Sequence, residues 1–176
     1  MSVREVLRLG DPHLRKPSLP VDEALFGSVE LNALIEDLRD TMAARDGAGL
    51  AAPQIGVHRR VVIVGITANP RYPEAPPIPE TVLINPVLTP RGDQRQLGWE
   101  GCLSVPGLRG QVERWQRLDL VWRDSLGGQH RQELDGFHAR VVQHECDHLD
   151  GLLFVDRLHD SRAFGFTQEL QAAGLL

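Results

Sequence analysis

Two histidines one helical turn apart, with a glutamate between them, are the residues of this chain best suited to chemistry. His144-Glu145-Cys146-Asp147-His148 has the pattern H-E-x-x-H. On a helix, imidazoles four residues apart can bind one ion, while the Glu that follows the first His reaches a water bound to that ion. The pattern predicts a metal-dependent hydrolase with Glu145 as its catalytic acid/base.

The third metal ligand is less clear than the first two. A catalytic ion of this type has three protein ligands and an open position for water. A third His in the metzincin arrangement is excluded, because Phe154 stands at its place. Glu169 lies 21 residues after His148, which suits a second class of zinc enzyme. Cys102 is the other candidate, since a thiolate would strengthen the binding of a borderline cation. Spacing alone leaves both open.

The two histidines need a helix, and the local sequence predicts one. Phe137, Val141, His144 and His148 follow one another at intervals of four, three and four residues, so they share one helix face. Cys146 follows His144 by two residues, which turns it away from that face. We expect Cys146 to pack in the core.

Other elements are predicted before this helix. An amphipathic helix is expected from Val29 to Arg45, and a strand from Arg60 to Ile66. Gly47 to Gln54 is too rich in Gly and Pro for a regular element, so we expect a loop there. Thr67 to Glu80 contains five prolines, which predict an exposed, stiff excursion without helix or central strand.

The remaining pattern indicates the fold class. Extended structure is expected from Thr81 to Ile84, and two alternating segments between Leu118 and Leu134 flank a glycine turn, which predicts a hairpin. Ser161 to Ala173 has a weak helical pattern. Strands without regular helix crossovers indicate an α+β fold, with mostly antiparallel sheets packed around the metal-binding helix. We expect residues 1–176 to form a single domain.

Composition excludes several classes of protein. The chain has 176 residues, of which 41% are hydrophobic and 24% charged, as in globular proteins. A net charge of -5 disfavours nucleic-acid binding. Residues 1–16 lack the apolar core of a signal peptide, and no later segment reaches membrane-spanning length. Two cysteines are too few for a disulfide framework, so we expect a cytoplasmic protein with free thiols.

Three segments together resemble the motifs of the peptide deformylase family, which are G-x-G-L-A-A-x-Q, E-G-C-L-S and Q-H-E-x-D-H-L. Residues 47–54, 100–104 and 143–149 match them in order. The resemblance extends from the first helix to about Phe154, and it favours Cys102 over Glu169 as the third ligand. It implies an enzyme that removes the N-formyl group from the formyl-methionine of nascent polypeptides and releases formate.

The resemblance also implies a role for each residue of the site. One divalent ion would be held by Cys102, His144 and His148, with the attacking water in its fourth position. Glu145 would take a proton from this water and deliver it to the departing amine. The oxyanion would be bound by the Leu50 backbone N–H and the Gln54 side-chain amide. Glu100 would orient a ligand or a loop.

Substrate contacts follow from the same resemblance. The residues concerned are Gly49, Gly101, Arg109, Val141, Phe137 and Ala48. The two glycines would pair their backbones with an extended peptide. The apolar side chains would line a slot for the methionine side chain, and Arg109 would contact the peptide.

Simpler roles stay open for several of these residues. Phe137 and Val141 are equally suited to an ordinary core. Arg109 is equally suited to be a solvated charge in a loop. The glycine-rich segment is also compatible with a tight connection that needs positive φ at Gly47 or Gly49.

The resemblance implies Fe(II) in the cell, with Zn, Ni or Co as replacements. The expected partners are N-formylmethionyl peptides, and no sequence feature indicates ribosome docking. Two rival functions remain at this point. A zinc peptidase would use Glu169 as its ligand and cleave unformylated peptides internally, whereas a catalytically silent binding domain would tolerate loss of Glu145.

Overall fold

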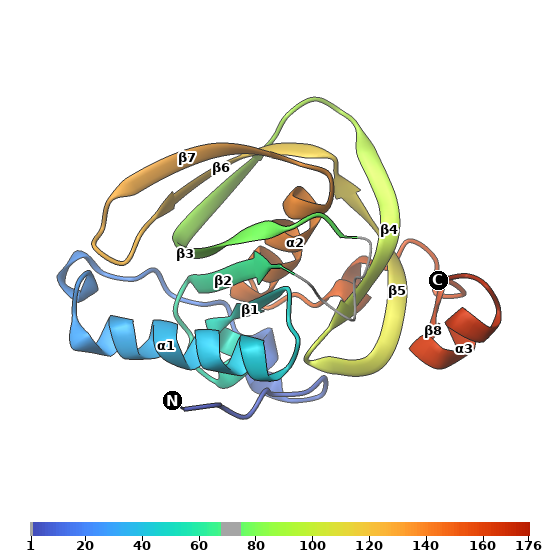
Figure 1. Cartoon of the computed structure of the whole chain (residues 1–176), viewed down its shortest axis with the longest axis horizontal. Helices are drawn as coiled ribbons and strands as arrows, with labels where there is room; N and C mark the ends of the chain where they lie inside the picture. Colours follow the sequence, from blue (N-terminus) through green and yellow to red (C-terminus); the bar gives the residue numbers. More distant parts are fainter. Residues whose placement is uncertain (1, 68–74) are drawn as a thin grey trace.

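The computed structural model describes residues 2–67 and 75–176, and Figure 1 shows the arrangement of its elements. The described residues form three α-helices and eight strands. The helices are α1 (Val29–Ala44), α2 (Gly136–Leu149) and α3 (Thr167–Ala172). The strands are β1 (Gly49–Ala51), β2 (Val61–Ile66), β3 (Ile78–Pro90), β4 (Arg95–Cys102), β5 (Val105–Trp115), β6 (Arg117–Arg123), β7 (Gln129–Asp135) and β8 (Phe164–Phe166).

Two antiparallel sheets surround α2. One sheet has the order β1-β2-β3-β6-β7 and the other the order β4-β5-β8. Helix α2 packs against β1, β2 and β7 of the first sheet and against β5 of the second, and its residues from Ala139 to Leu149 are all buried. Helix α1 covers β1 and β2 (Figure 1). The expected α+β fold, with mostly antiparallel sheets around the metal-binding helix, is confirmed.

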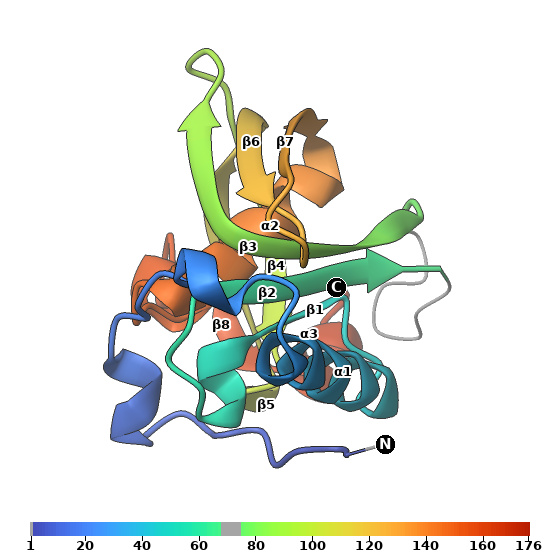
Figure 2. The same cartoon turned by 90° about the vertical axis from the view of Figure 1, so that its left-hand side faces the viewer.

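Strand β3 carries the larger sheet around α2 because it bends in its middle (Figure 2). Its first half pairs with β2 and its second half with β6, with a register shift between Ile84 and Val87. Asn85, inside this shift, has φ 51°, a conformation that Asn tolerates better than most residues. The Asn85 side chain also binds both the N–H and the C=O of Val21, at 2.8 and 3.0 Å. Hydrogen bonds to the backbone of Val21 therefore hold the bend of β3 in place.

Most elements predicted from periodicity are present. Helix α1 begins after Ser28, whose Oγ accepts a hydrogen bond from the Leu31 N–H at 3.1 Å, and it ends one residue before the predicted boundary. Strand β2 begins one residue after its predicted start, and the hairpin of β6 and β7 lies where the alternating segments placed it. Within the described residues, no helix is both long and apolar enough to span a membrane.

The glycine-rich segment is more regular than predicted. Gly49–Ala51 forms β1 and Ala52–Ile55 forms a 3-10 helix, and all of these residues are buried. Buried backbone groups need hydrogen-bond partners, and pairing with β2 supplies them. The prediction of a loop from Gly47 to Gln54 was therefore wrong over most of its length.

The proline-rich excursion ends earlier than predicted. Residues 68–74 lie outside the described part, but Ile78, Pro79 and Glu80 belong to β3. Pro79 and Glu80 together face the single residue Gly65 of β2, at a register shift of the ladder. Proline is tolerated at such bulges because no ladder hydrogen bond is required of it.

The β4–β5 hairpin was not predicted. Gly98 and Gly101 interrupt β4, and glycine weakens the sequence signal of a strand. Arg109 consequently lies within β5, opposite Gly101, and not in a loop as the sequence suggested. At the C-terminus, the regular helix is limited to α3, whose six residues are fewer than the predicted Ser161 to Ala173.

Helix α2 ends in a glycine turn that fixes the direction of the following chain. The Leu152 N–H donates to the Asp147 C=O at 3.0 Å and the Gly151 N–H to the His148 C=O at 3.2 Å, which is a Schellman motif. Gly151 has φ +74°, and a Cβ there would lie 2.5 Å from the Arg15 carbonyl oxygen. Only glycine adopts this positive φ without strain and also leaves room for the Arg15 carbonyl.

We predict that Gly151→Ala lowers the free energy of unfolding by more than about 2 kcal/mol, because a left-handed penalty of about 1–2 kcal/mol adds to a backbone clash. Gly56→Ala is the matched control, since Gly56 has φ +81° with no atom within 4 Å of its Cβ position. This control should lose only the left-handed penalty. Urea unfolding of both zinc-saturated variants measures the difference, and equal losses would contradict the role of the Arg15 contact.

Candidate metal centre

Three donor atoms from two elements converge inside the molecule. His144 and His148 come from α2, and Cys102 comes from the end of β4. Their ligand atoms lie within 4.8 Å of one another, and all three residues are buried. The Cys102 Sγ is 3.4 Å from the His148 Nε2. Among the described residues, no other group of His, Cys, Asp or Glu is gathered in this way.

The chemistry of these donors fits a divalent ion. Burial alone would raise the pKa of the Cys102 thiol, but the charge of His148 and hydrogen bonds with both imidazoles lower that pKa well below its usual range. A thiolate and two imidazoles are the ligands that zinc and other late first-row metals bind. The site therefore offers a thiolate and two imidazoles to one ion, whose binding would displace the protons that the imidazoles carry without it.

A buried carboxylate orients the first histidine. The Glu100 Oε2 is 2.9 Å from the His144 Nδ1, which leaves the Nε2 atom for the ion. Arg114 donates to both carboxylate oxygens of Glu100, from Nε and Nη2, at 2.9 Å each. Burial would raise the pKa of Glu100, but hydrogen bonds from Arg114 and His144 hold it far below its usual range. Glu100 is therefore ionised beneath the ligand.

Arg114 also binds a residue of the metal-binding helix α2. The Arg114 Nη1 donates to the Asp147 Oδ2 at 2.6 Å. Arg157 binds the same carboxylate with two nitrogens, at 2.6 and 2.7 Å. Asp147 thus ties α2 to β5 and to the turn after α2, and it lies outside the ligand set.

Glu145 lies against the glycine-rich segment. A Cβ at Gly49 would be 2.6 Å from the Glu145 Cγ and 2.7 Å from its Oε1. Neither Gly47 nor Gly49 has positive φ, so the alternative of a left-handed turn is wrong. Position 49 is occupied by glycine because β1 passes close to the Glu145 side chain. Burial also raises the pKa of the Glu145 carboxyl, against the charges of His144 and His148.

Gln54 is held beside the ligands. Its Oε1 accepts a hydrogen bond from the Ala51 N–H at 2.9 Å, which fixes the orientation of the amide. Its Nε2 lies 3.1 Å from the Ser104 Oγ and 3.5 Å from the Cys102 Sγ. The amide nitrogen of Gln54 therefore faces both the Cys102 thiol and the Ser104 hydroxyl.

The structure places Leu50 away from the reaction site. Leu50 pairs with Ile63 in the β1–β2 ladder, and the next amide, that of Ala51, turns to Gln54. Amides alternate in direction along a strand, so the Leu50 N–H points to β2. Its side chain is fully buried in the core beneath α1. The expectation that Leu50 binds the oxyanion was wrong, because a segment predicted as a loop is a paired strand.

A cavity opens beside the ligands. Its walls include five of the six residues expected to contact substrate, namely Ala48, Gly49, Gly101, Phe137 and Val141. Val141 and Ala48 also belong to the core cluster that covers the larger sheet. Each of them therefore both lines the cavity and packs in the core. Arg109 is not a wall residue.

Sequence reasoning missed three further wall residues, Trp99, Leu103 and Arg140. Arg140 precedes His144 by four residues, so the helical spacing that selected the other wall residues of α2 also applied to it. Trp99 lies in the unpredicted strand β4, where no pattern indicated a direction for its side chain.

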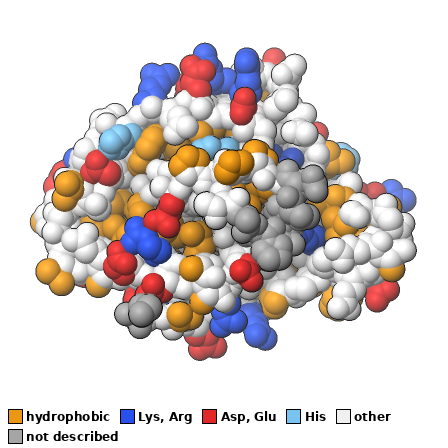
Figure 3. All heavy atoms as spheres, viewed as in Figure 1, with side chains coloured by type: hydrophobic (Ala, Val, Ile, Leu, Met, Phe, Trp, Pro, Cys, Tyr) orange, Lys and Arg blue, Asp and Glu red, His pale blue; other side chains and the backbone are white. Residues whose placement is uncertain are grey.

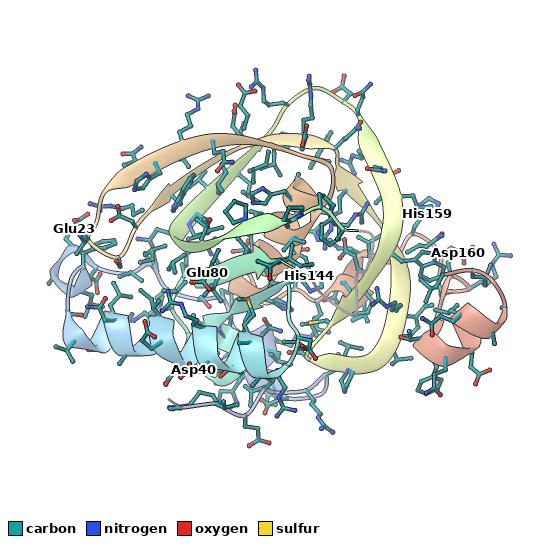
Figure 4. All side chains as sticks on the ribbon, in the orientation of Figure 1. Glu23, Asp40, Glu80, His144, His159 and Asp160 are labelled. Atoms are coloured by element: carbon teal, nitrogen blue, oxygen red, sulfur yellow. The ribbon has the colours of Figure 1, made fainter. Side chains whose placement is uncertain are left out.

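The rival ligand lies elsewhere. Glu169 is exposed on α3, which packs on β5 and β8 at the edge of the molecule. Figure 4 shows His144 in the interior, while His159 and Asp160 lie beside α3 at the periphery. Glu169 is thus excluded as a third ligand. Cys146 is buried in the core cluster, as expected, and burial raises the pKa of its thiol.

We predict that Cys102→Ala weakens zinc binding by more than about 100-fold, because even residues around metal ligands are worth about 10–100-fold in affinity. Cys146→Ala is the matched control and should bind zinc as the wild type does. Competition with a coloured chelator measures both dissociation constants. Equal weakening in the two variants would show that the thiol at position 102 is not a ligand.

Comparison with known proteins agrees with this geometry. The sequence profile described as polypeptide deformylase matches residues 3–163. Peptide deformylase 1 of Prochlorococcus marinus (strain MIT 9313) is 60% identical over 178 aligned residues, covering 100% of this chain and 91% of that protein. Peptide deformylase 1 of Nitrosomonas europaea is 55% identical, over 96% of this chain and 94% of that protein.

Solved structures show the same fold. The Met-Ala-Ser-bound class I type b peptide deformylase from Acinetobacter baumannii has a TM-score of 0.86 and 42% identity, covering 90% of this chain and 100% of that one. The peptide deformylase from Thermotoga maritima has a TM-score of 0.79 and 33% identity, over 91% and 100%. The chain therefore belongs to the polypeptide deformylase family of metal-dependent hydrolases, as its three motifs predicted.

Proposed function

We propose that this chain removes the N-formyl group from the formyl-methionine of nascent polypeptides and releases formate. One observation carries this proposal: a thiol and two imidazoles meet near the buried carboxyl of Glu145, and the cavity beside them is lined by Cys102, His144 and Glu145. In this proposal the ligands are Cys102, His144 and His148. A divalent ion on them would lower the pKa of a bound water and polarise the formyl oxygen.

Glu145 transfers the proton. It takes a proton as water adds to the formyl carbon, and it gives a proton to the amine as the C–N bond breaks, so formate and a free amino terminus are released. The carboxyl is buried, and its Oε2 has no hydrogen-bond partner among the described residues. Its raised pKa suits a group that must hold the proton between the two steps.

The amide of Gln54 stabilises the oxyanion that forms on the formyl group. For the second donor we propose the Leu103 backbone N–H in place of that of Leu50. Leu103 follows Cys102 directly and contributes to the same cavity wall. Donors fixed by the fold need no rearrangement when the negative charge develops.

The substrate lies between two sheet edges. β1 is one of the two outer strands of the larger sheet and β4 one of the two of the smaller sheet, and both contribute glycines to the cavity, Gly49 and Gly101. An extended peptide can add to such edges through its backbone. The methionine side chain then enters the cavity beside Ala48, Phe137 and Val141, and Arg109, across from Gly101, contacts the peptide farther along.

We also propose the setting of the reaction. Residues 1–176 act as one catalytic domain in the cytoplasm, with Fe(II) as the cellular ion and Zn, Ni or Co as replacements. The partners are N-formylmethionyl peptides, not nucleic acid. Figure 3 shows Lys and Arg side chains interspersed with Asp and Glu over the face viewed there, in keeping with the net charge of -5.

The test is formate release from formyl-Met-Ala-Ser under anaerobic conditions, with metal content measured on the same samples. We expect Glu145→Gln to lower kcat about 10²–10⁴-fold, the range for loss of a general acid/base, with metal retained. Glu169→Ala should keep both activity and metal. Full activity in Glu145→Gln, or cleavage of an unformylated peptide by the wild type, would refute the proposal.

Gly49→Ala tests the placement of Glu145. A methyl group there must displace the carboxylate, and displacement by about 1 Å can lower rates by about 10²-fold. We expect kcat to fall by about that factor while zinc affinity is unchanged. Gly165→Ala is the matched control, since a Cβ in this strand glycine would meet Leu170 at an ordinary 3.7 Å. Equal kcat values in the two variants would contradict the close contact.

A further inference from the structure

The ion-binding cluster depends on how two separate elements are held together. The two imidazoles belong to α2, whereas the thiol and the carboxylate that orients His144 belong to β4. A shift of β4 along α2 would change the ligand geometry without altering any ligand. The contacts between these two elements are therefore part of the site.

One side chain of α2 grips the backbone of the hairpin. The Arg140 Nη2 donates to the Gln96 C=O at 2.6 Å, and its Nη1 donates to the Val112 C=O at 2.9 Å. The Nη1 atom also donates to the Glu100 Oε1 at 2.9 Å. A single guanidinium thus binds both strands of the hairpin and the carboxylate beneath His144.

Arg140 is placed for this by the helix. It precedes His144 by one helical turn, so the two side chains leave α2 on the same face. Its side chain is 10% exposed and that of Glu100 is 4% exposed, so their ion pair is shielded from water. Removing one partner of a buried ion pair leaves an uncompensated charge.

A glycine on the strand makes room for the guanidinium. A Cβ at Gly98 would lie 2.9 Å from both the Cζ and the Nη2 of Arg140. The Gly98 carbonyl is itself 3.4 Å from the Arg140 Nη1. A side chain at position 98 would therefore force the guanidinium to leave its present position.

We propose that Arg140 is a positioning residue, which holds β4 against α2 so that Cys102 and Glu100 keep their places relative to the histidines. This inference rests on the metal ligands of the proposed function. Arg114 acts differently, because it joins carboxylates to one another, whereas Arg140 binds strand carbonyls. The planar fork of arginine suits several acceptors in fixed directions, and lysine cannot reproduce it.

The experiment compares Arg140→Met, Arg140→Lys and Gly98→Ala with the wild type, without using the reaction. Each protein is loaded with Co(II), and the thiolate-to-cobalt absorption is recorded; zinc dissociation constants come from chelator competition. We expect Arg140→Met and Gly98→Ala to weaken zinc binding by about 10–100-fold and to shift the cobalt absorption. Arg140→Lys should recover only part of the affinity.

Matched controls separate positioning from general damage. Arg131→Met removes an arginine whose side chain is 70% exposed, and Gly165→Ala adds a methyl group without a clash. Both should keep the wild-type spectrum and zinc affinity. If Arg140→Met does not fold, Gly98→Ala and Arg140→Lys decide the outcome.

Three results would overturn the inference. The first is wild-type zinc affinity and cobalt absorption in both Gly98→Ala and the folded Arg140 variants. The second is a lower melting temperature with unchanged metal properties, which would indicate a purely structural role. The third is a raised KM with unchanged metal properties, since that would make Arg140 a substrate contact. A wild-type protein without thiolate-to-cobalt absorption would instead refute the proposed ligand set.

Discussion

The ionised carboxylate of Glu100, buried between two arginines and a histidine, is the interaction on which the site depends. A charge taken out of water is tolerated only when it is paired and hydrogen-bonded. Each oxygen of Glu100 has two such partners, at 2.9 Å each. These partners come from β5 and α2, so satisfying one carboxylate fixes three elements at once. The ligand geometry follows from that pairing.

The burial of α2 is the second constraint. This helix carries His144, Glu145, Asp147 and His148, yet residues 139–149 are buried. The bent strand β3 wraps the larger sheet around one side of it, and the β4–β5 hairpin closes another. Polar groups within such a shell interact strongly, because little water screens them.

Local spacing predicted the helix and its three functional residues, since partners four residues apart on a helix are also neighbours in space. Spacing could not decide between Cys102 and Glu169, because the number of residues between two positions does not give their distance in the folded protein. The family motifs supplied that choice. Leu50 failed because strand pairing set the direction of its amide. Strand β4 was not predicted because Gly98 and Gly101 weaken its strand pattern. The absence of a side chain at Gly98 nevertheless makes room for the Arg140 guanidinium.

The two edge strands that meet at the cavity have a consequence for how broadly the protein acts. Unpaired strand edges invite association with other chains, and proteins usually protect them. Here residues of the edge strands β1 and β4 line the same cavity, where the proposed substrate is a single extended chain end. Backbone groups are the same in every polypeptide. In the proposed mode of binding, a site that binds backbone and encloses one side chain would accept chain ends of almost any sequence, with its selectivity confined to the first residue.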